Sequence, residues 1–118
     1  MSLEWEQIIV DAADPVGLGR WWCDALDWVV VEEDPEEFEI RPAPDRMPGL
    51  LFVQVTEPKT TKNRLHIDLR PDDRDAEVER LLGLGATRAA IGQGEQSWVV
   101  LADPEGNEFC VLGSRAGG

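Results

Sequence analysis

The chain has 118 residues, a formal net charge of −13 and five tryptophans. This length suits one compact domain or two small interlocked units, and the tryptophans indicate a folded protein. Such an acidic surface repels phosphate backbones and anionic lipid headgroups. We therefore expect no nucleic-acid or membrane partner, and a cationic ligand is favoured over an anionic one.

The cellular compartment is predicted from the same features. No apolar run approaches the roughly 20 residues that cross a bilayer, and the N-terminus lacks the basic and apolar regions of a signal peptide. Cys23 and Cys110 lie far apart in the sequence and form no CxxC pair. Because this usage is typical of reduced thiols, we expect a cytoplasmic protein.

The first half of the chain predicts a strand, a helix and three further strands. The first strand covers residues 5–12. Asp14 and Pro15 then predict a helix start, because Asp accepts backbone N–H bonds as an N-cap and Pro fits the first helical position. The helix is expected to end near residue 26. Runs rich in β-formers or with alternating polarity predict strands over 28–32, 36–41 and 50–56.

The second half repeats this order of elements. A strand is predicted over 64–70, followed by a helix from about residue 72 that Gly83 and Gly85 end. Strands follow at 87–91, 97–102 and 107–112, and a turn is expected at 92–96. The last two strands form a hairpin around residues 103–106, where Gly106 supplies the positive φ that such a turn needs.

A strand followed by an Asp-capped helix thus recurs at an offset of 59 residues, at Asp14 and Asp73. The repeat predicts an α+β fold in one domain, residues 1–118, with module one at 1–58, a linker at 59–63 and module two at 64–118. Each module is a βαβββ unit. Two units that are each too small to close a core are expected to share a cleft, to which both contribute matching residues.

The strand at 64–70 carries the most informative side chains. Alternation places its apolar residues, beginning with Leu65, on the face that should pack under the following helix. The opposite face carries His66, the only histidine, together with Asp68. Since such a face often meets solvent in an antiparallel sheet, this strand alone does not require a site.

The first half offers matching positions. Gln7 holds the place on the first strand that His66 holds in the second half. Gln54 lies on the fourth strand of the first half, and Glu108 and Cys110 share a face on the fourth strand of the second. If both sheets curl into one cup with the helices on its outer face, these lone-pair donors converge.

Residues 14–28, 62–69 and 98–110 carry recognisable motifs, among them the DPEGN hairpin at 103–107. In this order they resemble small glyoxalase-like members of the vicinal oxygen chelate superfamily, which includes glyoxalase I, extradiol dioxygenases, fosfomycin-resistance enzymes and bleomycin-resistance proteins. The resemblance covers nearly the whole chain. It implies paired βαβββ modules that form a cup-shaped mixed sheet, and it implies a homodimer.

The resemblance also implies where a divalent metal would bind. Metal-using relatives take ligands from the first and fourth strands of each half, which correspond here to Gln7, Gln54, His66 and Cys110. The relatives usually carry glutamate at both fourth-strand positions, whereas this chain has an amide and a thiol. Two amides, an imidazole and a thiol hold a hard cation weakly. We therefore expect an incomplete metal set, with a Zn, Ni, Mn or Fe ion as the alternative.

Three functions remain open. The first is a bleomycin-resistance-like protein that binds a small cationic or planar molecule between the modules, against aromatic walls such as Trp98. The second is a divalent-metal-dependent lyase, isomerase or dioxygenase. The third is a dimerisation module without a ligand. The predicted pocket residues are Gln7, Asp11, Gln54, His66, Asp68, Trp98, Glu108 and Cys110. Candidates for its anionic complement are Asp11, Glu37, Glu39 and Asp68.

Overall fold

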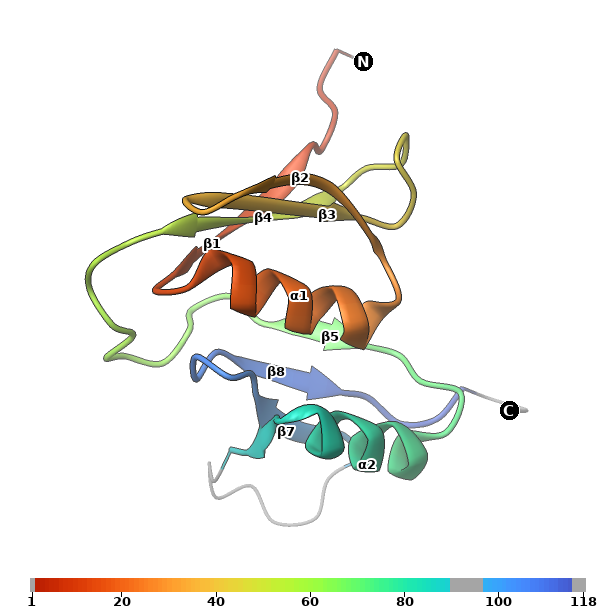
Figure 1. The fold of residues 1–118 in the computed structure, drawn as a ribbon. Helices are drawn as coiled ribbons and strands as arrows, with labels where there is room; N and C mark the ends of the chain where they lie inside the picture. The colour runs from red at the N-terminus through yellow and green to blue at the C-terminus, as the bar shows by residue number, and fades with distance from the viewer. Residues whose placement is uncertain (1, 90–96, 116–118) are drawn as a thin grey trace. The chain divides into compact units, whose positions relative to one another are not determined.

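The computed structural model of the protein describes residues 2–89 and 97–115, and it divides into two compact units, residues 1–58 and 59–118. Each unit contains, in chain order, one strand, one helix and three strands (Figure 1). The predicted α+β class with two βαβββ modules is therefore confirmed. Each module carries its own four-stranded mixed sheet.

Unit 1 places one helix on one face of its sheet (Figure 1). The strands β1 (Gln7–Ala12), β2 (Val29–Asp34), β3 (Glu37–Arg41) and β4 (Gly49–Gln54) are arranged in the order β1-β4-β3-β2. β1 runs parallel to β4, and the other pairs are antiparallel. The helix α1 (Pro15–Leu26) packs against β3 and β4. The core between them consists of Leu18, Trp21, Trp22, Ala25, Phe38, Ile40, Leu50 and Phe52.

The start of α1 follows the prediction. The Asp14 side chain accepts a hydrogen bond from the Gly17 N–H at 3.1 Å, and Pro15 occupies the first turn. The helix ends at Leu26, where Asp27 adopts a left-handed conformation with φ of 55°. Inside the helix, Gly19 lies so close to the Phe38 ring that no side chain fits there. This close approach seats α1 on β3.

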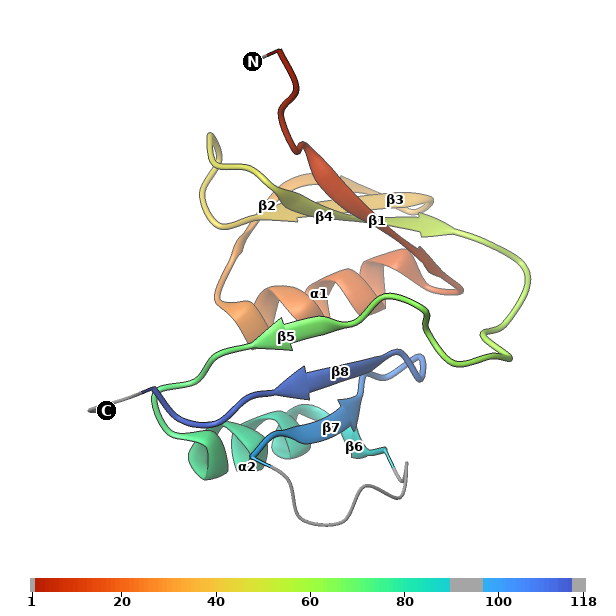
Figure 2. The same ribbon diagram turned by 180° about the vertical axis from the view of Figure 1, so that it is seen from behind.

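Unit 2 has the same plan with shorter strands (Figure 2). The strands β5 (Ile67–Leu69), β6 (Thr87–Arg88), β7 (Val99–Ala102) and β8 (Glu108–Val111) lie in the order β5-β8-β7-β6. The helix α2 (Arg74–Leu84) packs against β8. As predicted, Asp73 caps this helix by accepting a hydrogen bond from the Ala76 N–H. The core of the unit consists of Val78, Leu81, Leu101, Phe109 and Val111.

The predicted hairpin between β7 and β8 is confirmed. Asp103, only 3% exposed, accepts hydrogen bonds at Oδ1 from the N–H groups of Glu105 and Asn107, each at 2.9 Å. Gly106 has a φ of 87°, the left-handed conformation that favours glycine. The buried Asp103 carboxylate therefore organises the turn.

Several predicted boundaries are wrong. The first strand begins at Gln7, so Trp5 precedes it and is exposed. β5 covers only Ile67–Leu69, because pairing with β8 begins at Ile67. Leu65 is consequently 87% exposed and does not pack under α2. Gly83 lies inside α2, and Gly85 alone caps the C-terminus of this helix. Residues 90–91 of one predicted strand, and the turn at 92–96, lie outside the described residues.

Neither of the two helices in the described part of the chain has the length and hydropathy that a membrane-spanning helix needs.

Candidate functional site

The sheet of unit 1 presents a second face, on the side away from α1. Directly paired residues on neighbouring strands share a face, and the register pairs Ile9 with Leu51 and Leu51 with Glu39. Phe38, which alternates with Glu39 along β3, points toward α1. We call this second surface the acidic face. Its residues are Gln7, Ile9, Asp11, Glu32, Asp34, Glu37, Glu39, Arg41, Gly49, Leu51 and Val53.

The acidic face holds a buried charge. Glu39 is 8% exposed, and its Oε2 accepts a hydrogen bond from the Arg41 Nε at 2.8 Å. A Cβ on Gly49 would lie 3.0 Å from Arg41 Cγ and 3.3 Å from Glu39 Oε2. The ion pair therefore lies over the position where Gly49 lacks a side chain.

Two predicted pocket residues lie on the same face. Gln7 pairs with Gly49 across one strand, so it lies about 10 Å from Arg41 at the usual strand spacing. Asp11 pairs with Val53, which in turn pairs with Glu37. Ile9, at 57% exposure, lies between them on β1. The face thus combines an apolar centre with carboxylates around it.

Gln54 does not join Gln7. The parallel register pairs Gln7 with Gly49 and Ala12 with Gln54, at opposite ends of β1 and β4. The two pairs lie five positions apart along the strands, or about 16 Å. Alternation also turns Gln54 to the same side as Phe52, toward α1. The expectation that both amides serve one site is therefore wrong for this unit.

In unit 2, Cys110 and Asp68 lie opposite each other on β8 and β5. Cys110 is 7% exposed. Burial raises the pKa of the Cys110 thiol, and the neighbouring Asp68 charge and a hydrogen bond to it raise the pKa further, against a smaller lowering by Lys62. The thiol therefore stays protonated at neutral pH, which disfavours it as a metal ligand and as a nucleophile.

Glu108 is engaged by the segment that precedes β5. Its Oε1 lies 3.1 Å from Lys59 Nζ and accepts a hydrogen bond from the Asn63 N–H at 3.3 Å. Burial alone would raise the pKa of Glu108. Hydrogen bonds from its own backbone N–H, from Lys59 and from Asn63 outweigh that effect and lower the pKa. The carboxylate thus anchors the predicted linker, residues 59–63, to β8.

The two remaining predicted residues lie just outside strands. His66 is exposed and directly precedes β5, and Trp98 is half-buried and directly precedes β7. The convergence of residues from both modules at one point stays a prediction.

The residues present do not fit the divalent metal that the superfamily often uses. Within residues 2–89 and 97–115, no three His, Cys, Asp or Glu side chains are grouped so as to hold a metal ion. Gln54 faces away from Gln7, and Cys110 carries its proton toward Asp68. We therefore derive no chemical step through a metal.

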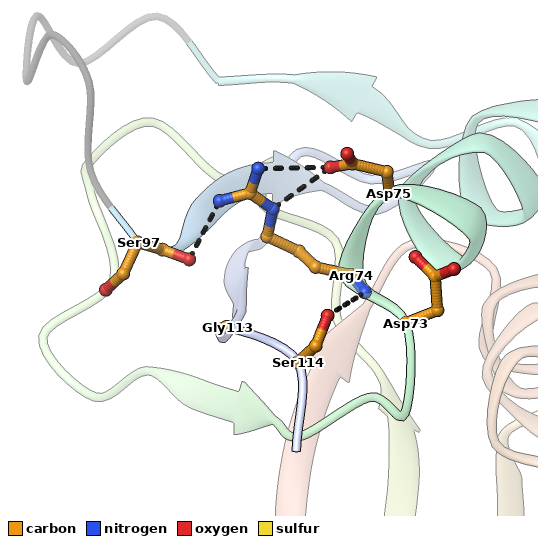
Figure 3. A pocket seen from close by; sticks show the side chains of 6 residues that line it. All are labelled: Asp73, Arg74, Asp75, Ser97, Gly113 and Ser114. Atoms are coloured by element: carbon orange, nitrogen blue, oxygen red, sulfur yellow. Dashed lines mark hydrogen bonds and ion pairs between the residues drawn. The ribbon is translucent and has the colours of Figure 1, made fainter. Parts of the chain in front are cut away.

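A separate pocket lies at the N-terminus of α2 (Figure 3) and is lined by Asp73, Arg74, Asp75, Ser97, Gly113 and Ser114. Arg74 donates to Asp75 Oδ1 at 3.1 Å and to the Ser97 carbonyl at 3.0 Å. Its backbone N–H donates to Ser114 Oγ at 2.8 Å. These bonds join the C-terminal segment to the helix, and the pocket contains none of the predicted site residues. We interpret this pocket as a structural contact between the C-terminal segment and α2.

The model of the glyoxalase-like domain family matches residues 7–112, so the chain belongs to this family. The predicted membership of the vicinal oxygen chelate superfamily is thereby confirmed. No curated protein matches the chain.

Solved structures share the fold at low sequence identity. A glyoxalase/bleomycin resistance protein/dioxygenase family enzyme from Burkholderia phytofirmans PsJN is 15% identical with a TM-score of 0.75, over 96% of this chain and 100% of that one. TnmS3, an antibiotic binding protein from Streptomyces sp. CB03234, is 18% identical with a TM-score of 0.62, over 98% and 99%. A glyoxalase-related enzyme from Fulvimarina pelagi is 16% identical with a TM-score of 0.67, over 94% and 88%.

Sequence reasoning missed Arg41, Ile9 and Leu51 on the acidic face. Alternation over 37–41 places Arg41 on the same face as Glu39, and the ion pair between these two side chains lies over Gly49. A second signal was present in the sequence. Residues 1–58 contain 14 acidic and 3 basic residues, whereas residues 59–118 contain 10 and 8. The negative charge is therefore concentrated in unit 1.

Proposed function

We propose that this glyoxalase-like protein binds a small cationic, planar molecule on the acidic face of unit 1. The observation that carries the proposal is the buried Glu39 carboxylate beside the apolar side chains of Ile9 and Leu51. Small-molecule sites combine apolar walls with a few placed polar groups. A flat apolar body resting on Ile9 and Leu51 would bring its cationic group to Glu39.

The charge distribution supports a cation. Five carboxylates, from Asp11, Glu32, Asp34, Glu37 and Glu39, share the face with one basic side chain, that of Arg41. A surface with one sign of charge raises the local concentration of the opposite ion and speeds its association. An anionic ligand would meet repulsion at the same place.

The antibiotic-binding name of TnmS3 supports binding as the activity, although its identity to this chain shows the fold alone. In unit 2, the expectation that His66, Asp68 and Trp98 line a pocket stays a prediction. The metal-dependent lyase, isomerase or dioxygenase gains no support from the donor set. Homodimerisation stays a prediction, for which light scattering during size-exclusion chromatography is the test.

The test uses calorimetric titration with three compounds of one shape and different charge: benzamidine, benzamide and benzoate. Proflavine and metal-free bleomycin extend the series to larger cations. We expect at least one cation to bind, with benzamidine bound more tightly than benzamide and benzoate not bound. Equal binding of benzoate, or no binding of any cation at millimolar concentration, would contradict the proposal.

A further inference from the structure

Among the described residues, two charged side chains are buried, Asp103 and Glu39. Asp103 is accounted for by the N–H groups of the hairpin that it organises. Glu39 lies in the middle of a regular strand and organises no turn. Its partner in the described part of the chain is Arg41, two residues along the same strand. Within the described residues, Glu39 is thus paired with one side chain, whereas Asp103 is held by backbone N–H groups.

The Glu39–Arg41 ion pair uses only part of the hydrogen-bonding capacity of the carboxylate and of the guanidinium. A single bond joins Arg41 Nε to Glu39 Oε2, whereas a guanidinium can grip a carboxylate with two parallel bonds. A second donor of Arg41, Nη1, reaches the Pro44 carbonyl at 3.5 Å, the outer limit of a hydrogen bond. The carboxylate therefore retains acceptor sites that a planar amidinium or guanidinium could fill in the paired geometry.

The surroundings leave Arg41 room to move. Its side chain is 21% exposed, against 10% for Glu39, so the guanidinium forms the outer member of the pair. Gly49 places no side chain beneath it. On the other side of Gly49, Gln7 offers an amide that can accept or donate a hydrogen bond.

We propose that Glu39 binds the cationic group of the ligand, and that Arg41 holds this place in the ligand-free protein and is displaced on binding. This inference rests on the proposed function and names the chemistry of the bound group, an amidinium or a guanidinium. Arg41 then acts as an internal competitor. It keeps Glu39 paired when no ligand is present and excludes cations too weak to replace it.

The experiment measures benzamidine affinity by calorimetric titration for the wild type, Glu39→Gln, Arg41→Gln and a control, Glu36→Gln. Glu36 is exposed, lies one residue before β3 and outside the acidic face, and its substitution removes the same charge as that of Glu39. Loss of a charge-assisted bond predicts a roughly tenfold or larger weakening for Glu39→Gln. Removal of the competitor predicts tighter binding for Arg41→Gln, and Glu36→Gln should bind as the wild type does.

The outcomes separate the two proposals. No binding of benzamidine by the wild type overturns the inference, and the other cations in the series then decide whether the proposed function survives. Wild-type binding that Glu39→Gln leaves unchanged, or that Arg41→Gln weakens, overturns the inference alone. If Glu39→Gln fails to fold, the Arg41 Nε–H signal in ¹⁵N-edited NMR of the wild type provides the readout. Benzamidine should shift this signal and expose it to solvent exchange, and an unchanged signal in a protein that binds benzamidine overturns displacement.

Discussion

Asp68 and Cys110 lie opposite each other on the parallel strands β5 and β8, and the Asp68 carboxylate, together with burial, raises the pKa of the Cys110 thiol. This relationship keeps the proton on sulfur at a position predicted from the sequence as a metal ligand. Cysteine is a residue type that can bind metal, but the surroundings of Cys110 keep its thiol buried and protonated.

Removing the Asp68 charge should make Cys110 more reactive. Burial and the Asp68 carboxylate together raise the pKa of the thiol, and Asp68→Asn removes the second contribution. In a Cys23→Ser background, the midpoint of the iodoacetamide rate against pH should move to lower pH, and the rate at pH 8 should rise severalfold. Glu79→Gln, an exposed charge change on α2, is the control. Equal profiles for Asp68→Asn and the control would contradict the assignment.

Glu108 should contribute stability that depends on pH. Its pKa is lowered in the folded protein from the ordinary value of 4.5. A carboxyl group of this kind stabilises the fold above its unfolded pKa, and the contribution is lost as the pH falls through the folded pKa. Glu108→Gln should therefore lower the free energy of unfolding by about 1 kcal/mol at pH 7, since the group is partly exposed.

Urea unfolding at pH 7 and again below pH 4 measures this effect. The difference between the wild type and Glu108→Gln should shrink at the lower pH, because protonated glutamate resembles glutamine. Lys59→Met should reproduce part of the loss at pH 7, since Lys59 Nζ contacts the same carboxylate. A difference that stays constant with pH would show that Glu108 acts through packing instead.

Two helical glycines should respond in opposite directions to alanine. A Cβ on Gly19 would lie 2.2 Å from the Phe38 ring, whereas a Cβ on Gly83 would meet nothing within 4 Å. We expect Gly19→Ala to destabilise the protein by about 2 kcal/mol through overpacking. Gly83→Ala should stabilise it by about 0.5 to 1 kcal/mol through helix propensity. Thermal unfolding by circular dichroism measures both, and a stabilising Gly19→Ala would contradict the packing of α1 on β3.

Metal binding should be weak and independent of the predicted ligands. Equilibrium dialysis against Zn²⁺, Ni²⁺ and Mn²⁺, with metal analysis of the retained protein, should give less than one ion per chain. His66→Ala and Cys110→Ser should not change that ratio, because no three His, Cys, Asp or Glu side chains within residues 2–89 and 97–115 are grouped so as to hold a metal ion, and the register separates Gln7 from Gln54. A stoichiometric ion that His66→Ala removes would restore the metal-dependent alternative.

Local patterns in the sequence predicted the elements well. Asp14 and Asp73 marked both helix starts, and Asp103 to Asn107 marked the hairpin, because caps and turns depend on neighbouring residues alone. Register could not be predicted in the same way. The sequence predicted that Gln7 and Gln54 serve one site, but the pairing of β1 with β4, which depends on contacts between distant residues, separates them.

The most direct test of the account is a ¹H–¹⁵N NMR titration of the uniformly labelled protein with benzamidine. The account predicts that the amides of Gln7, Ile9, Glu39 and Gly49, on the acidic face, shift together with one affinity, while Leu18 on α1 does not shift. Saturable shifts confined to residues 59–118, or no saturable shift at any residue, would contradict it.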